Sequence, residues 1–320
     1  MSPFLDYVIA SIAIGMTFLY GCTGEIITEK AGHLNLGIPG IMCIGGSFGC
    51  YAITLTYKSG IPGFLVVLIA IVAAILGGAL MGFVYSFLTV SLKANQNVTG
   101  LAMTTFGVGL TKFIMNRLAT NSAAYLHALK YFRFPFYGMK GVGALVYCGL
   151  MLYLAIAIAV FTAFVLNKTK VGLHLRAVGE NPATADAAGI NVTRYKYLAT
   201  IIGSSVAALG GLYYIMDYAG SNEAYKTIEA LGWLAVALVI FTLWRPNLSI
   251  IGSIVFGFLY LAGTRIPTIL GIKLSMSATP LLQMLPYVVT IIVLIIISVR
   301  KKRENQPPAS LGLPYFREER

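Results

Sequence analysis

The sequence is poor in charged side chains, and poorest in acidic ones. Of its 320 residues, 11 are Asp or Glu and 23 are Lys or Arg, so 11% are charged, against about 25% in a soluble domain. Apolar residues make up 58%, and the mean hydropathy is +0.82. This composition excludes an ordinary soluble domain and indicates a polytopic membrane protein. The net charge of +12 fits basic loops near anionic lipid and predicts no nucleic-acid partner.

The chain also lacks the motifs of nucleotide hydrolysis and of common hydrolases. It has no G-x-x-x-x-G-K-[ST] phosphate loop, so we expect that it does not hydrolyse ATP alone. It has neither an H-E-x-x-H motif nor a G-x-S-x-G elbow. We therefore expect no catalytic residue, no cofactor and no enzyme activity in this chain.

Metal-ligating residues are few and scattered. The three histidines, His33, His127 and His174, are far apart in the sequence and are expected to be loop or interface residues. The four cysteines lie in or beside apolar runs without paired metal spacing, which indicates small apolar side chains rather than ligands or disulfides. They are Cys22, Cys43, Cys50 and Cys148. No metal site is predicted.

Apolar segments dominate what is present. The sequence predicts an all-α polytopic bundle of about nine transmembrane helices. Eight or ten spans stay open because residues 24–40 and 261–280 are ambiguous. The transmembrane domain is placed over residues 1–299, and a C-terminal tail over residues 300–320. The nine segments are 5–27, 36–56, 61–92, 97–118, 143–166, 197–216, 228–244, 248–271 and 280–299.

Basic residues predict the orientation of the bundle. Two clusters at span ends should be cytoplasmic, because cytoplasmic loops carry an excess of Lys and Arg. One is the start of the tail, Arg300–Arg303, and the other is the loop 167–196. Four spans separate them, so both fall on the same side. The C-terminus is therefore predicted to be cytoplasmic.

The loop contains a short helix with clear start and stop signals, within residues 171–190. Asn181 is a good N-cap, Pro182 suits the first helical position, and Ala183–Ala188 are mostly strong helix formers. Gly189 supplies a stop. These signals predict a helix of about seven residues, roughly 10 Å long. So small an element is either a docking piece or a solvated connector.

Two stretches interrupt the hydrophobic pattern in similar ways, one in each half of the chain. They are Gly24–Gly46 and Asp217–Leu238. Each has glycine, acidic and amide residues followed by a new apolar run, which is typical of discontinuous helices near a transport path. Freed backbone groups at such a break need protein or water to satisfy them. Ordinary surface loops are the alternative.

Neutral polar residues near these interruptions are candidates for a solute path. Amide side chains can bond a sugar or a base edge, and an indole can stack on a planar ring. A capped helix start and an interfacial tryptophan explain the same residues without a solute. Asp217 and Arg265 are the best candidates for charges within the membrane, and no ladder of buried carboxylates predicts an ion relay. The candidate path residues are Asn35, Gln96, Asn97, Asn222 and Trp233.

Several segments resemble one family of transport proteins. GEIITEKAGHLNLGIPGIMCIGG and HLRAVGENPATADAAGINVTRYKY resemble permease subunits of ABC importers of the ribose and branched-chain amino acid class. ANQNVTGLAMTTFGVGL, LLQMLPYVVTIIVL and LGLPYFREER are similar to the nucleoside, simple-sugar-like permeases of that class. The resemblance covers about residues 20–320. In one place it departs from the family, because Pro39 stands where a glutamate is common.

The resemblance implies a permease subunit in the cytoplasmic membrane of a prokaryote. Such a subunit forms the solute path with a second permease chain, often a related but different one. Two ATPase subunits bind ATP and dock below, and a solute-binding protein or lipoprotein delivers the solute. The short helix would be the coupling helix, with Arg176, Glu180, Asn181, Asp186 and Gly189 as its contact and shape residues.

The implied solute is a nucleoside or a related sugar-like compound. Branched-chain amino acids and simple sugars stay open, and Pro39 could mark a divergent member of a permease pair or a different solute. An ion-coupled secondary transporter is disfavoured by the missing buried ionisable pairs. An intramembrane enzyme is disfavoured by the missing nucleophile–base constellation.

Overall fold

The computed structural model describes residues 3–57, 59–118, 124, 128–129, 131–132, 149–271, 281–282, 284–300 and 306–316. Within these ranges, eight helices are long and apolar enough to cross a membrane, and Leu285–Ile296 adds a shorter apolar one. The prediction of a helical bundle with about nine spans is confirmed. The helices are α1 (Pro3–Glu29), α2 (Ile38–Thr56), α3 (Gly63–Ser86), α4 (Gln96–Leu118), α6 (Leu150–Lys168), α7 (Lys170–Glu180), α8 (Pro182–Ala187), α9 (Val192–Tyr213), α10 (Ile228–Phe241), α11 (Pro246–Leu270) and α13 (Leu285–Arg300).

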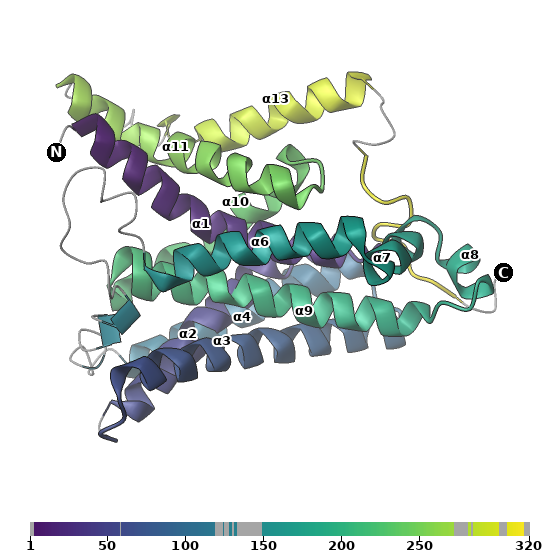
Figure 1. Cartoon of the computed structure of the whole chain (residues 1–320), viewed down its shortest axis with the longest axis horizontal. Coiled ribbons are helices and arrows are strands. Elements are labelled where there is room, and N and C mark those ends of the chain that lie inside the picture. Colours follow the sequence, from purple (N-terminus) through teal and green to yellow (C-terminus); the bar gives the residue numbers. More distant parts are fainter. Residues whose placement is uncertain are drawn as a thin grey trace.

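The long helices run side by side along the long axis of the molecule (Figure 1). α7, α8 and the C-terminus lie at one end, which we call the α8 end, and the N-terminus lies at the other. Proline and glycine set several boundaries. Pro246 is the first residue of α11, where its missing N–H costs no helical bond, and Gly271 ends that helix at a φ of +66°.

α2 and α9 form the centre of the bundle, because most residues of their apolar stretches are buried. In α3, α4, α6 and α11, well under half of the apolar stretch is buried. Glycine permits close helix contacts here. A Cβ on Gly40 of α2 would lie 2.6 Å from the Cα of Thr104 in α4, so only glycine fits at this crossing. The many glycines in the sequence thus serve backbone-to-backbone packing.

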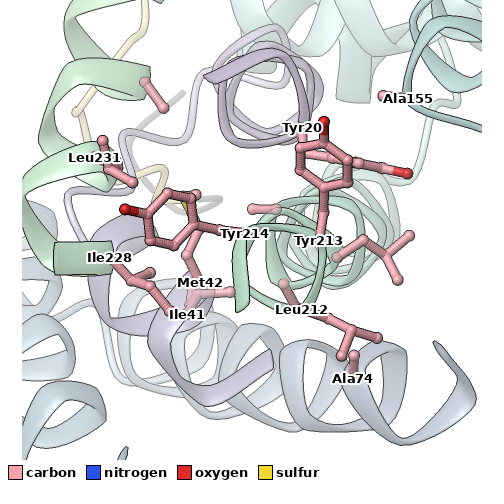
Figure 2. Packing of buried hydrophobic residues seen from close by; sticks show 14 of the residues in the cluster. Tyr20, Ile41, Met42, Ala74, Ala155, Leu212, Tyr213, Tyr214, Ile228 and Leu231 are labelled. Atoms are coloured by element: carbon pink, nitrogen blue, oxygen red, sulfur yellow. The ribbon is translucent and has the colours of Figure 1, made fainter. Parts of the chain in front are cut away.

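Aromatic side chains fill the space between the central helices (Figure 2). Tyr20 and Tyr213 are buried with their ring centroids 6.0 Å apart. Their hydroxyl groups donate to backbone carbonyls, Tyr20 to Met151 at 2.7 Å and Tyr213 to Ala13 at 2.8 Å. Each buried hydroxyl therefore has a hydrogen-bond partner on another helix, and the two bonds connect α1 to both α6 and α9.

The described cysteines agree with their prediction. Cys22, Cys43 and Cys50 are buried free thiols. Cys148 and His127 lie outside the described residues, as do residues 301–303 of the predicted basic cluster.

Candidate functional site

The short helix α8 (Pro182–Ala187) forms with the predicted signals. The Asn181 Oδ1 accepts a hydrogen bond from the backbone N–H of Thr184 at 3.0 Å, and Gly189 has a φ of +83°. A second helix, α7, precedes it directly and was not predicted. The Thr169 hydroxyl caps α7 by accepting from the N–H of Gly172 at 3.2 Å. The sequence holds this signal, a threonine three residues before Gly172, inside a stretch that we interpreted as loop.

The candidate coupling residues fall on two sides of this helix pair. Glu180, Asn181 and Gly189 are exposed, whereas Arg176 and Asp186 are half-buried. A small apolar cluster holds α8 against α7 and the start of α9. Its buried members are Val178, Ala185 and Val192. The helix therefore presents one edge to the outside while its other edge is attached to the bundle.

The C-terminal segment 306–316 lies across the α8 end and contacts both short helices. The Ser310 N–H donates to the Gly179 carbonyl at 3.1 Å, which ties the segment to α7. The Tyr315 hydroxyl donates to the Asp186 carboxylate at 2.8 Å, which ties it to α8. We call this segment the C-terminal strap.

The strap also contacts the first residues around α4. The Lys93 ammonium donates to the Tyr315 carbonyl at 2.7 Å, and burial lowers the pKa of this lysine. The Gln96 amide donates to the Leu313 carbonyl at 3.5 Å. A groove of about 500 Å³ lies beside α8, lined by Lys93, Asp186, Tyr315 and residues 189–194. The α8 end thus combines a protruding helix with an adjacent groove.

The first predicted break, Gly24–Gly46, is a helix end, a turn and an extended segment inside the bundle. α1 continues to Glu29, and α2 begins at Ile38. Between them, Leu36 packs so closely on Gly100 that a Cβ there would lie 2.9 Å from the Leu36 nitrogen. α2 therefore starts beside the second turn of α4, within the protein rather than at its surface.

Side chains satisfy the non-helical backbone of this segment. The Leu34 N–H donates to Gln96 Oε1 at 2.8 Å, and the Tyr85 hydroxyl donates to the Leu34 carbonyl. The Asn35 N–H donates to Glu25 Oε1 at 3.0 Å. Such bonds are what allow irregular backbone to be buried inside a protein. The first break is thus closed by protein.

Two more bonds complete the closure of the segment. The Gly37 N–H donates to the Asn35 side-chain oxygen at 3.0 Å, and the Thr104 hydroxyl donates to the Leu36 carbonyl at 2.8 Å. Two candidate path residues, Asn35 and Gln96, are therefore buried and bonded to backbone groups.

Sequence reasoning missed two buried acids. Glu25 and Glu29 lie one turn apart on α1 and are almost completely buried. Glu29 accepts a hydrogen bond from the Trp244 indole, which closes the turn between α10 and α11 onto α1. Of the two charges that the sequence favours within the membrane, Asp217 is buried and Arg265 is exposed. The spacing Glu25-x-x-x-Glu29 in an otherwise apolar run was the signal that could have identified the pair.

His33 is buried between two threonines at the α8 end. Its Nδ1 lies 2.8 Å from the Thr200 hydroxyl and its Nε2 lies 2.8 Å from the Thr89 hydroxyl. Burial, with a smaller contribution from the Lys196 charge, lowers the pKa of His33 to about 3. The ring is therefore neutral at pH 7 and donates from one nitrogen while accepting at the other.

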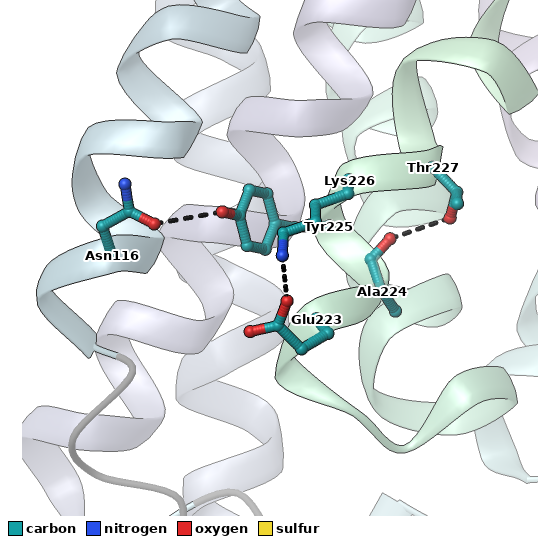
Figure 3. A network of polar contacts seen from close by, with 6 residues as sticks. All are labelled: Asn116, Glu223, Ala224, Tyr225, Lys226 and Thr227. Atoms are coloured by element: carbon teal, nitrogen blue, oxygen red, sulfur yellow. Dashed lines mark hydrogen bonds and ion pairs between the residues drawn. The ribbon is translucent and has the colours of Figure 1, made fainter.

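The second predicted break, Asp217–Leu238, has a different form. α9 continues into a π-helical turn, Tyr214–Ala219, and a 3₁₀ turn, Asn222–Thr227, follows the left-handed Gly220. The Tyr225 hydroxyl donates to Asn116 of α4 at 3.1 Å (Figure 3). A cavity of about 310 Å³ lies beside this turn. The second break therefore borders open space.

The five candidate path residues do not converge on one site. Asn35 and Gln96 are buried at the α8 end, and Asn97 is exposed beside them at the start of α4. Asn222 lies in the 3₁₀ turn of the second break, and Trp233 is half-buried in α10. Their assignment to a solute path stays a prediction.

Comparison with known proteins identifies the family. Residues 4–297 match the family described as the permease component of the branched-chain amino acid transport system. The chain belongs to this permease family. As a member, it is a multi-pass membrane transport subunit of an ABC transporter, and its α8 occupies the loop that carried the sequence resemblance.

Two nucleoside-type permeases are similar to this permease over nearly its whole length, and a third over about two thirds of it. The nucleoside ABC transporter permease protein NupC of Lactococcus lactis is 32% identical over 91% of this chain and 92% of its own. The guanosine ABC transporter permease protein NupQ of Bacillus subtilis is 30% identical over 98% of both chains. A second Lactococcus lactis permease, NupB, is 22% identical over 67% of this chain and 60% of its own.

Proposed function

We propose that this permease forms half of the solute path of a nucleoside importer and works with a second, different permease chain. The proposed identity of the solute rests on the similarity to the nucleoside and guanosine permeases over more than nine-tenths of the chain. The existence of two matching permeases in one Lactococcus lactis strain supports the unequal pair. Partner subunits would bind and hydrolyse ATP, and a solute-binding protein would deliver the nucleoside.

The α8 end faces the cytoplasm in this proposal, and α8 docks on an ATPase subunit. Most of the described basic residues lie at this end, which suits the cytoplasmic face. They are Lys30, Lys93, Lys168, Lys170, Arg176, Arg194, Lys196 and Arg245. The exposed edge of α8 and the adjacent groove offer a surface for the ATPase, while the strap and the apolar cluster connect α8 to the bundle.

The transport proposal is tested by uptake into vesicles that contain this chain, the second permease and the ATPase pair. ATP and a loaded binding protein should drive accumulation of guanosine or uridine, with ribose and leucine as competitors of other classes. Uptake by this chain alone on an ion gradient would contradict the proposal. Uptake of ribose or leucine instead of nucleosides would support an ATP-driven importer but contradict the proposed solute.

The docking proposal is tested by an exposed position on α8. Ala187→Arg places charge and bulk on the outer edge without touching the strap contact of Asp186. We expect loss of ATPase co-purification or of ATP-driven uptake, because a helix in a fitted cleft does not tolerate such a side chain. Ser59→Arg, exposed at the opposite end, is the control. Equal behaviour of the two variants would contradict docking through α8.

A further inference from the structure

The cavity beside the second break lies between α2, α4 and the start of α10. Its volume of about 310 Å³ falls within the range of small-molecule sites, about 300–1,000 Å³. Four separate segments contribute to its wall, so it is a product of the tertiary fold. Its polar lining residues are Cys43, Thr111, Lys112, Tyr225, Lys226 and Glu229.

Two opposite charges face this space from different helices. Lys112 lies on α4 and Glu229 in the first turn of α10. Among the residues that the structure describes, neither has a hydrogen bond or an ion pair, although both line the same cavity. Lys226 differs, because it is paired with Glu223 (Figure 3). The cation Lys112 and the anion Glu229 can therefore both form hydrogen bonds to a solute in the cavity.

Hydrogen bonds position two residues of the remaining wall. Tyr225 is buried, and its hydroxyl donates to the Asn116 side-chain oxygen at 3.1 Å (Figure 3). Thr111 is buried and contacts the Ser47 hydroxyl at 3.3 Å. An aromatic ring fixed beside polar groups is suited to a planar heterocycle that also carries hydroxyls.

Lys112 is an exposed cation on α4, a helix that also exposes apolar side chains such as Phe106 and Phe113. A charge facing hydrocarbon is costly, so Lys112 suits a position beside a water-filled path or a protein partner.

We infer that the cavity binds a ribonucleoside during transport. Glu229 accepts hydrogen bonds from the vicinal hydroxyls of the ribose, and Lys112 donates to a ring nitrogen or carbonyl of the base. An acidic side chain bonded to ribose hydroxyls is the arrangement that dinucleotide-binding folds also use. The inference rests on the proposed function and assigns the residues that discriminate a ribonucleoside from its deoxygenated analogues.

The test compares ATP-driven uptake of uridine and of 2′,3′-dideoxyuridine by the complete transporter with saturating binding protein. Glu229→Gln should lower the uridine rate about tenfold or more and leave the dideoxyuridine rate within about twofold, because only uridine has the hydroxyls. Lys112→Met should lower both rates, since both solutes carry the base. Asp6→Asn, in the first turn of α1, and Arg117→Gln are matched controls outside the set of lining residues, and should change neither rate.

The outcomes separate this site from the proposed function. If the wild-type transporter imports no nucleoside, the proposed function fails. If it imports uridine but Glu229→Gln behaves like Asp6→Asn, or lowers the uptake of both solutes equally, the site is overturned. Lys112 is exposed, so its variant should fold even if Glu229→Gln does not assemble. Wild-type uptake by Lys112→Met would overturn the inference independently.

Discussion

The two interruptions of the hydrophobic pattern show similar composition and opposite structures. The first break, after Glu29, inserts extended backbone beside α4, and side chains bond several of its backbone N–H and C=O groups. The second break, after Tyr213, passes through π and 3₁₀ turns and borders a cavity with unpaired charges. Glycine, amide and acidic residues therefore mark irregular backbone in both, but only the packing decides whether their polar atoms bond the protein or face open space.

The largest loss of stability is expected at the crossing of α2 and α4, which holds the first break in place. Gly40→Val would place carbon within 2.6 Å of the α4 backbone at Thr104. We expect no stable bundle, with a loss of more than about 3 kcal/mol, because two helix backbones must separate. Yield and monodispersity in detergent measure it. Gly109→Val, with nothing within 4 Å of the added Cβ, is the control and should give normal protein.

The closure of the first break is tested by Gln96→Ala. This change leaves the buried Leu34 N–H without its acceptor, and such an unsatisfied group costs about 1–3 kcal/mol. Thermal unfolding should show a clear drop. Asn97→Ala, at the adjacent exposed position, should leave stability unchanged. If Gln96→Ala instead unfolds like the wild type and loses only uptake, Gln96 belongs to the solute path, and both breaks then border the path.

The neutral state of His33 predicts a dependence of stability on pH. The pKa is lowered from 6.5 to about 3 in the folded chain, so the unfolded chain binds more protons between these values. Stability is complete above pH 6.5 and falls as the pH drops towards 3. Between pH 7.5 and 5.5 the loss should be about 1.4 kcal/mol. Unfolding measured at both pH values checks this.

His33→Gln is the matched variant for that prediction. A glutamine can bond a threonine hydroxyl but does not titrate, so the difference between pH 7.5 and 5.5 should shrink. An unchanged difference would mean that other groups cause it and that the ring between Thr89 and Thr200 is not the sensor.

The smallest effect is expected at the strap. Tyr315→Phe removes one hydrogen bond to Asp186 from a half-buried site, for about 1 kcal/mol. Global unfolding should change little, but limited proteolysis should cut the strap faster. Leu313→Ala, which changes an exposed side chain of the strap, is the control. Equal cleavage in both variants would show that the bond to α8 does not hold the strap.

Local patterns in the sequence predict the membrane helices, the short helix α8 and the family, although not α7. Apolar runs long enough for a bilayer predicted the spans, and the signals at Asn181, Pro182 and Gly189 predicted α8 almost to the residue, because capping is a local property. The partners of the polar residues, in contrast, follow from the tertiary packing alone. Gln96 accepts a hydrogen bond from the Leu34 N–H, 62 positions away, and Lys112 and Glu229 line the same cavity. Such partners are distant in sequence and are brought together by helix packing, which no local pattern encodes.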